Sequence, residues 1–263
     1  ADGEVLWSIE VDGAVALHGI AVDADDNILV TGVGEDGDAF VAKFSADGSS
    51  LLWSDFLGGA SGEEYGWGIA VDTTGNVYIV GDSNSSEDWG HGADAYWYIA
   101  EGVEGIPEDH VFVAKLSSDG DLQWTAHIGG DGEDAGWMKM DIALDALVNL
   151  LIAGSTETPD FPMAEGEMLG ERDGFVSKLS AEGELLWSSY LGGSDYYDLA
   201  LGIAMDAEGN ALVTGITCSD DFVGALNEPL AGEYGFEEAF VTKVAPDGTV
   251  LWTVYLGNSL FPA

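Results

Sequence analysis

The chain has 263 residues, of which 49 are Asp or Glu and six are Lys or Arg, so its formal net charge at pH 7 is −43. This balance argues against nucleic acid as a partner, because a phosphate backbone is held by Lys and Arg. Hydrophobic residues make up 46% of the chain, enough for a core. No run of 18 apolar residues occurs, so no membrane insertion is expected, and the single Cys218 excludes an internal disulfide framework.

The acidity predicts the solution in which the protein works. A folded chain with so many like charges repels itself, and molar salt shortens the Debye length to about 3 Å, which removes most of that cost. We therefore expect a halophilic or marine protein. The alternative is a calcium-dependent protein with many carboxylate sites.

The first elements in chain order form a set that later recurs. Residues 19–32, GIAVDADDNILVTG, are typical of two short strands, here named a and b, joined by a turn. Strand c follows at 39–44 (AFVAKF). Strand d lies within 47–59 (DGSSLLWSDFLGG), after an Asp-Gly turn that favours a hairpin. A lone copy of strand d precedes them at 2–11 (DGEVLWSIEV).

The same set of strands recurs three more times. The a–b segments occupy 68–81, 141–154 and 202–215, the c strands 111–116, 174–179 and 239–244, and the d segments 119–130, 182–193 and 247–258. The strand-d tryptophans are Trp7, Trp53, Trp124, Trp187 and Trp252. Strands that are apolar on both faces suit sheets sandwiched between neighbours.

This repetition predicts an all-β fold, a β-propeller of four-stranded antiparallel blades, with four full repeats plus one extra outer strand at the N-terminus. We expect one domain over 1–263. Its repeat units lie near 2–11 (partial), 17–59, 66–130, 136–193 and 200–258.

These motifs resemble the SBBP (seven-bladed β-propeller) repeat family. The matching segments are GIAVDTTGNVYIVG at 68–81, DFP at 160–162, AFVAKF at 39–44 and LLWSSYLGG at 185–193. The resemblance implies a β-propeller, usually in a secreted or cell-surface protein, and it brings no shared catalytic residues. The chain departs from the family in having four complete units instead of seven. Its first unit also lacks the long b–c segment.

The strand count leaves the two ends of the propeller open to three interpretations. The lone N-terminal strand d and the strand d of the last unit would compete for one blade edge. The chain is then a piece of a longer propeller, or the ring closes with a five-stranded last blade, or one strand d pairs with another molecule.

The longest insertion, 82–108, lies between strands b and c of the second unit and is rich in aromatic residues. Loops on a rigid scaffold often carry binding residues. The candidates for binding are Trp89, His91, Tyr96, Trp97 and Tyr98, with Trp67 and Trp137 in the neighbouring d–a connections. The alternatives are an extra strand or lid that packs on the blades, a protein interface, and a glycan site.

Acidic residues gather in the d–a connections, where Glu64, Asp134 and Asp198 are candidate calcium ligands. Ca²⁺ requires six to eight oxygen ligands. The alternative is that these loops are simply solvated. We therefore expect no cofactor, with Ca²⁺ as the possible exception.

Four of the six basic residues occupy the same position in strand c. They are Lys43, Lys115, Lys178 and Lys243. The a–b turns that begin at Asp23, Asp72, Asp145 and Asp206 should lie at the same end of the blades. We predict structural Lys–Asp pairs, in the same or an adjacent blade.

Catalytic motifs are scarce. His18, His91, His110 and His127 are scattered, without metal-ligand spacing on one element. Cys218 has no adjacent His. We expect a non-catalytic extracellular or cell-surface scaffold that binds a protein partner or self-assembles through edge strands. The alternative is a glycan-binding module of a larger secreted enzyme or adhesin.

Overall fold

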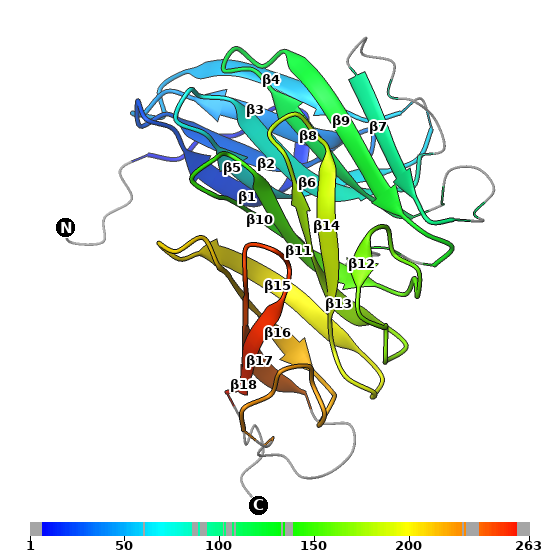
Figure 1. The fold of residues 1–263 in the computed structure, drawn as a ribbon. Coiled ribbons are helices and arrows are strands. Elements are labelled where there is room, and N and C mark those ends of the chain that lie inside the picture. The colour runs from blue at the N-terminus through cyan, green and yellow to red at the C-terminus, as the bar shows by residue number, and fades with distance from the viewer. Residues whose placement is uncertain are drawn as a thin grey trace, which may run out of the picture.

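The computed structural model describes residues 7–59, 61–85, 89, 94–101, 103, 107, 109–132, 134, 139–227, 229 and 237–256. These residues form strands and turns that are grouped in four separate sheets (Figure 1). Within these ranges there is no helix of the length and apolarity that a bilayer crossing requires. The protein is a β-propeller built from blades.

Each sheet is one blade, numbered 1 to 4 in chain order. Blade 1 contains β1 (Ala14–Val22), β2 (Ile28–Gly34), β3 (Ala39–Phe44) and β4 (Leu51–Leu57). Blade 2 contains β5 (Glu64–Val71), β6 (Val77–Ser83), β8 (His110–Leu116), β9 (Leu122–Gly129) and β7 (Asp94–Ile99). Blade 3 contains β10 (Asp141–Leu144), β11 (Leu150–Thr156), β13 (Asp173–Leu179), β14 (Leu185–Leu191) and β12 (Ala164–Glu165). Blade 4 contains β15 (Asp198–Met205), β16 (Ala211–Thr217), β17 (Glu238–Val244) and β18 (Val250–Tyr255).

Blades 2 and 3 each have a fifth strand that the four-stranded repeat did not predict. β7 pairs in parallel with β9, and β12 pairs in parallel with β14. Both come from the b–c insertions, which return along the outer edge of their blade. An uncovered strand edge presents unpaired N–H and C=O groups that invite pairing with other chains. The insertions cover these edges, whereas blade 1 has a short b–c connection and keeps β4 as its edge strand.

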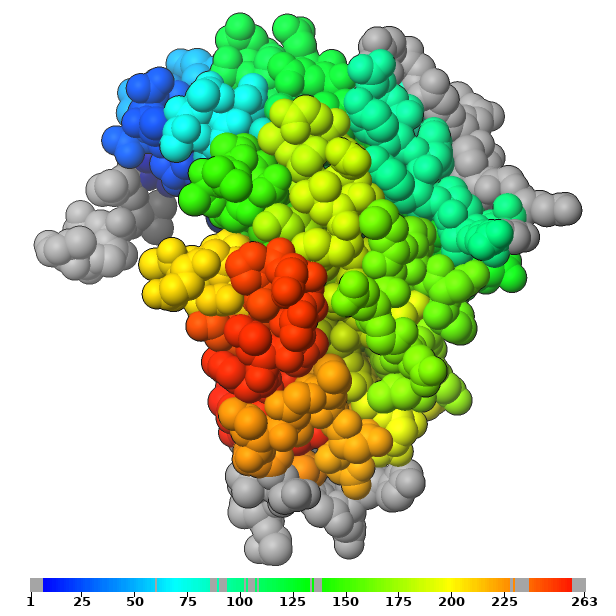
Figure 2. Space-filling view, in the orientation of Figure 1, coloured from blue at the N-terminus to red at the C-terminus, as the bar shows by residue number. Residues whose placement is uncertain are grey.

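The blades follow one another in an open arc. Strands β1 and β2 pack on β5, β5 packs on β10, and β10 and β11 pack on β15. No comparable contact joins β15 back to β1 among the strands described above. In Figure 2, blade 1 (blue) and blade 4 (yellow to red) form the two ends, with blades 2 and 3 between them. Three apolar clusters fill the three blade junctions.

A tryptophan in strand d joins each blade to the next. The indole Nε1–H donates to a carbonyl in the following blade's c–d turn: Trp53 to Ser118 (3.1 Å), Trp124 to Ala181 (3.2 Å) and Trp187 to Pro246 (3.1 Å). The ring lies over the glycine two residues further along each turn. These glycines have φ near +90° and no Cβ, so they suit both the left-handed turn and the close ring. We call this contact the indole latch.

The N-terminal segment differs from its prediction. Residues 7–11 form no strand, and 1–6 lie outside the described residues. Trp7 nevertheless lies against Gly48, the turn glycine of blade 1, where the latch of a preceding blade would sit. The segment also contributes Val11 to the apolar cluster on the face of blade 1 that points away from blade 2. A strand needs a ladder partner for its backbone groups, and the described residues contain no sheet before blade 1 to provide one.

The indole latch predicts a difference between two tryptophans at the same repeat position. Trp124→Phe removes the hydrogen bond to Ala181 and part of a buried ring, so the free energy of unfolding should fall by about 1–2 kcal/mol. Trp252→Phe should change the free energy of unfolding by less than about 0.5 kcal/mol, because the Trp252 indole has no hydrogen-bond partner within the described part of the chain. Urea unfolding of dilute protein measures both. Equal losses in the two variants would contradict a stabilising role for the latch.

Candidate functional site

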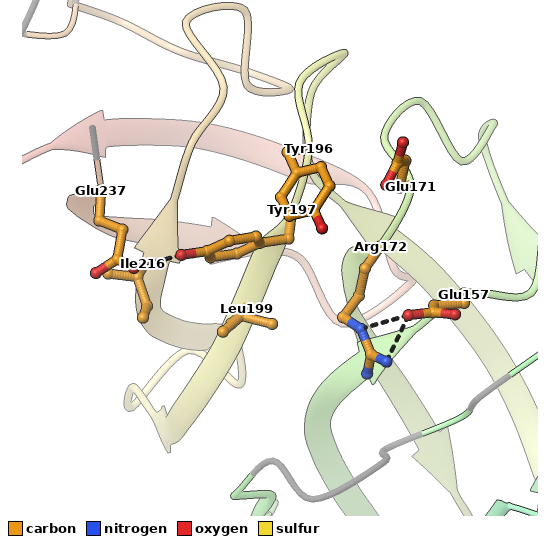
Figure 3. A pocket seen from close by; sticks show the side chains of 8 residues that line it. All are labelled: Glu157, Glu171, Arg172, Tyr196, Tyr197, Leu199, Ile216 and Glu237. Carbon is orange, nitrogen blue, oxygen red and sulfur yellow. Dashed lines mark hydrogen bonds and ion pairs between the residues drawn. The ribbon is translucent and has the colours of Figure 1, made fainter. Parts of the chain in front are cut away.

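A pocket of about 390 Å³ lies where blades 3 and 4 meet (Figure 3). It is lined by Glu157, Glu171, Arg172, Tyr196, Tyr197, Leu199, Ile216 and Glu237. Arg172 bonds to Glu157, with Nη2 and Nε 2.6 and 3.0 Å from Oε1. The Tyr197 hydroxyl donates to Glu237. Tyr196 is 65% exposed and offers an open ring beside carboxylates, which is an arrangement able to stack on and hydrogen-bond a polyol.

The pocket was not predicted from the sequence. Its residues come from four connections and two strands that are up to 80 positions apart. The only signal was the Tyr-Tyr pair at 196–197 within an acidic d–a connection.

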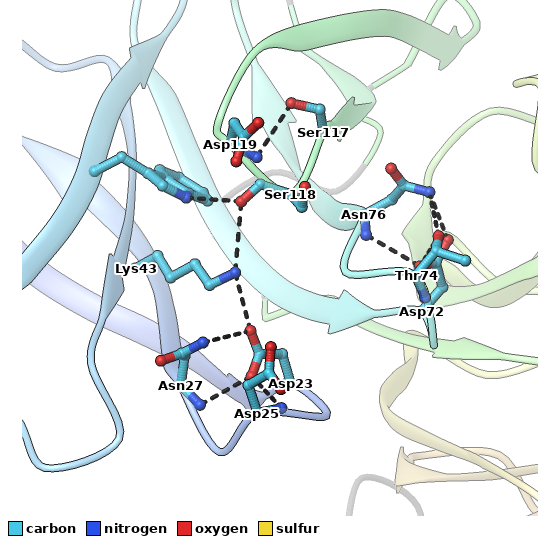
Figure 4. Close-up of polar contacts among 11 residues, drawn as sticks. Asp23, Asp25, Asn27, Lys43, Asp72, Thr74, Asn76, Ser117, Ser118 and Asp119 are labelled. Carbon is cyan, nitrogen blue, oxygen red and sulfur yellow. Dashed lines mark hydrogen bonds and ion pairs between the residues drawn. The ribbon is translucent and has the colours of Figure 1, made fainter.

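An Asp side chain organises the a–b turn of each blade. In blade 1, Oδ1 of Asp23 accepts the backbone N–H groups of Asp25 and Asn27 at 2.9 Å, and Oδ2 accepts the Asn27 amide at 3.0 Å (Figure 4). Asp72 with Asn76, Asp145 with Asn149, and Asp206 with Asn210 repeat this arrangement. Short Asx side chains stabilise turns by such bonds to their own backbone.

In three blades the strand-c lysine forms an ion pair with this Asp. The Nζ–Oδ2 distances are 2.9 Å for Lys43–Asp23, 2.9 Å for Lys178–Asp145 and 2.7 Å for Lys243–Asp206. Burial of Asp23 disfavours its charge, but the bonds from Asn27 and Lys43 outweigh this and lower its pKa to about 2. These lysines hold turns in place and are not available for chemistry.

Blade 2 departs from the predicted Lys115–Asp72 pair. The Asp72 carboxylate accepts the hydroxyl of Tyr78 at 3.2 Å. Lys115 donates to the Ala181 carbonyl of blade 3 at 3.0 Å and lies over the Tyr78 ring. The other blades have Leu at the position of Tyr78. One Leu-to-Tyr difference therefore replaces the lysine as the partner of the turn carboxylate.

The aromatic insertion of blade 2 packs onto its own blade as strand β7. Trp97 stacks on His127 with ring centroids 4.0 Å apart, and the Tyr98 hydroxyl donates to the Gly183 carbonyl at 3.0 Å. Tyr96 packs edge-on against Trp124. This is the extra-strand alternative considered for the insertion. Its aromatic rings are mostly committed to contacts within the molecule.

The remaining aromatic candidates have separate positions. Trp89 is buried and packs edge-on against Phe112 and His127. Trp67 stacks on His18 and donates its N–H to Asp82. His91 and Trp137 lie outside the described residues.

Two histidines meet inside blade 2, which their spacing in the sequence did not suggest. His110 Nε2 and His127 Nδ1 are 3.0 Å apart across β8 and β9. Burial lowers the pKa of His110 to about 4, and burial together with the neighbouring His110 lowers that of His127 to about 3. Both rings are thus neutral at physiological pH. The register of the β8–β9 hairpin was the signal that could have revealed the pair.

The three candidate calcium ligands lie at three different blade junctions and form no common site. All three are fully buried. Glu64 and Asp198 begin β5 and β15, and Asp134 forms an isolated bridge with Thr156 ahead of β10. Each lies near a residue at the beginning of strand c in the preceding blade. Glu64 lies near Asp38, Asp134 near His110, and Asp198 near Asp173. Among the described residues, no group of three or more His, Cys, Asp or Glu side chains could hold a metal ion.

The two ends of the arc expose apolar side chains whose equivalents are buried at every internal junction. Ile20 of blade 1 is 71% exposed, whereas its counterparts Ile69, Ile142 and Ile203 are 8%, 6% and 8% exposed. At the other end Leu256 is 55% exposed, whereas the equivalent Leu57, Ile128 and Leu191 are fully buried. We call these surfaces the entry face of blade 1 and the exit face of blade 4. Exposed apolar sheet faces of this kind mark interaction sites.

Because the carboxylates at the blade junctions are buried, we expect the free energy of unfolding to fall as the pH rises. Burial raises the pKa of Asp198 to about 6, and the charge of Asp173 adds to the effect. The pKa in the unfolded chain is near 3.8, so the folded state binds more protons between these values. The stabilisation is complete below about pH 4 and is lost as the pH rises through about 6.

Asp198→Asn tests this dependence because it keeps the shape without the charge. Relative to the original chain, its free energy of unfolding should be higher by roughly 1–2 kcal/mol at pH 7.5 and little changed at pH 4. Urea unfolding at the two pH values measures it, with Asp195→Asn in the same loop as the control. A difference that is independent of pH would contradict the assignment.

Comparisons with known proteins agree with the blade architecture. A family model described as a beta-propeller repeat, SBBP, matches residues 52–87, which run from strand β4 of blade 1 through β6 of blade 2. No curated protein matches the chain.

Several solved structures resemble the chain at low identity. A protein of unknown function from Bacteroides caccae is 12% identical, with a TM-score of 0.46, and the match covers 96% of this chain and 86% of that one. A europium-containing methanol dehydrogenase is 11% identical, with a TM-score of 0.46 over 88% of this chain and 52% of that one. A protein of unknown function from Dyadobacter fermentans is 8% identical, with a TM-score of 0.44 over 92% and 68%.

The matched segment 52–87 contains one complete instance of the step from strand d of one blade to strands a and b of the next. The same strand order recurs in the other blades. The chain is therefore a β-propeller protein whose segment 52–87 matches the SBBP repeat.

Proposed function

We propose that this protein is a non-catalytic scaffold that acts outside the cell or at its surface, by assembling with itself or by binding protein partners. The supporting observation is the pair of open blade faces. The entry and exit faces expose apolar side chains whose equivalents are buried at every internal junction. Covering such surfaces is the main favourable term in protein association.

The charge of the chain sets the conditions for this role. Two copies that each carry −43 repel one another at low ionic strength. Salt screens this repulsion while it leaves the apolar contacts in place, or strengthens them. A saline environment is therefore part of the proposal. An extracellular location is what the resemblance to SBBP repeats implies.

The proposal of a non-catalytic role is supported by what the reactive side chains do. His110 and His127 are buried against each other, and three strand-c lysines are paired with turn carboxylates. Cys218 is partly buried, and burial raises its thiol pKa, which disfavours the nucleophilic thiolate.

The mass in solution tests the proposed assembly. At about 0.15 M salt, light scattering should give the single-chain mass of 27.5 kDa, and at about 2 M salt it should give a multiple of that mass. The physical reason is the loss of repulsion between the acidic copies. A single-chain mass at both salt concentrations, up to about 10 mg/mL, would contradict self-assembly.

A second candidate function is glycan binding, which is favoured by the pocket around Tyr196. An exposed aromatic ring beside carboxylates is able to stack on a sugar face and accept its hydroxyl protons. Saturation-transfer NMR with cellotriose, xylotriose and chitotriose should show a bound sugar that Tyr196→Ala releases. Leu226→Ala is the control, because it removes an exposed side chain outside the pocket. No transfer to any of the three sugars would argue against this function.

A further inference from the structure

We propose that two copies of this chain associate head to tail, so that the exit face of each blade 4 packs on the entry face of the other copy's blade 1. This inference rests on the self-assembly proposed above and specifies its geometry. It yields a closed ring of eight blades with two identical junctions. The occupant of each open face is a second copy of this chain.

The exposed side chains of the two open faces match those that meet at an internal junction, while Val30 and Phe40 of the entry face are buried with Val11 of the same chain. At each internal junction an Ile from the first strand of one blade meets apolar residues of the preceding blade's exit side. Blade 1 offers Ile20 for that role, and blade 4 offers Leu256 at the position of Leu57 and Leu191. Thr214 of blade 4 is likewise exposed, whereas the equivalent Thr31 is fully buried by blade 2. The surface that best complements each face is therefore the other one.

Blade 4 presents the donor half of an indole latch, and blade 1 presents the acceptor half. Trp252 occupies the position of Trp53, Trp124 and Trp187, and Ala46 occupies the position of the carbonyls that receive them. Within the described residues, the Trp252 indole N–H and the Ala46 carbonyl have no hydrogen-bond partner. Lys243 completes the donor half, as Lys43 and Lys115 also reach the next blade's turn carbonyl.

Trp7 occupies the acceptor turn in the isolated chain. Its ring lies against Gly48, where the ring of a preceding blade's tryptophan would lie. Docking of the partner's Trp252 would therefore displace Trp7. The N-terminal segment competes with the second copy, so removing the Trp7 ring should favour association.

The number of copies follows from the number of blades. Propellers close with four to eight blades, and each copy supplies four. Two copies reach the upper end of that range, and three would exceed it. A head-to-tail contact generates a ring when its rotation closes and a filament when it does not. The proposal is the closed pair, with twice the single-chain mass.

Cross-linking of single-cysteine chains tests the geometry directly. In a Cys218→Ser background, one chain carries Ala46→Cys in the acceptor turn and another carries Val254→Cys. Val254 is equivalent to Ser189, whose hydroxyl bonds to the turn carbonyl of Gly248. A short bismaleimide at about 2 M salt should join the two chains when they are mixed and should join neither chain to itself.

A third single-cysteine chain separates this inference from the proposed function. Leu52→Cys lies on β4, the uncovered edge strand of blade 1. If Leu52→Cys joins to itself and the mixed pair does not react, the protein self-assembles through strand edges and the head-to-tail inference is wrong. If the protein keeps the mass of a single chain and no pair of cysteines cross-links, both the proposed self-assembly and the head-to-tail inference are wrong. The open faces would then belong to further blades or to another protein.

Substitutions on the faces provide a second test with a matched control. Ile20→Asp and Leu256→Asp should each weaken association at least about tenfold, because they place a charge in an apolar junction. Leu251→Asp is the control. It lies in β18, the strand that Leu256 directly follows, and is 49% exposed, and its equivalents Leu52 and Leu186 remain exposed even beside a neighbouring blade. Equal effects of Leu251→Asp and Leu256→Asp would overturn the proposed face.

Trp7→Ala gives a prediction of opposite sign. If Trp252 replaces Trp7 on the blade 1 turn, this variant should lower the dissociation constant several-fold. Sedimentation at about 2 M salt measures it. An unchanged or higher dissociation constant would overturn the exchange of the two tryptophans.

Discussion

The constraint on which the structure depends is that a blade cannot keep water from both of its own faces. Each of the four sheets carries a central Phe in strand c that is fully or almost fully buried. In blades 2 to 4 the preceding blade covers this Phe, and in blade 1 the ring packs on Phe56 in the cluster that includes Val11. Blades are therefore stable as a series in which each contacts the next. The indole latch and the reach of Lys43 and Lys115 into the following turn serve this one requirement. They fix how far each blade is rotated on its neighbour.

The scarcity of positive charge is a second constraint on the structure, because it limits how many carboxylates can have a cationic partner. A chain with six cations does not neutralise 49 carboxylates, and it concentrates four of them at one repeat position. Three of these four hold the a–b turns, where a buried carboxylate without a partner would be most costly. The outer surface is left almost purely anionic. Neighbouring carboxylates at the junctions, such as Asp173 and Asp198, are tolerated because burial favours their protonated forms.

Much of this architecture follows from local patterns in the sequence. The Asp-Gly turns, the strand-d tryptophans and the repeated GIAVD segments are local signals, so they predict blades and place Lys43, Lys178 and Lys243 near their Asp partners. The features that were missed depend on three-dimensional geometry. Tyr78 takes over Asp72 because its hydroxyl reaches a carboxylate six residues away. The pocket at Tyr196 joins segments that no periodicity relates. The parallel pairing of β7 depends on how an irregular insertion returns along its blade.

The placement of the lysines also determines how the protein responds to proteases. A trypsin-like enzyme cleaves only after Lys or Arg, and one such residue lies in the central strand c of each blade, between two hydrogen-bonded neighbours. A protease must bind its substrate as an extended, separated segment, so a cut at any of these lysines requires that blade to open. Each blade thus carries one cleavage site within its strand c, and the two remaining sites, Lys139 and Arg172, lie outside the strands. The order in which tryptic fragments form would report the order in which the blades come apart.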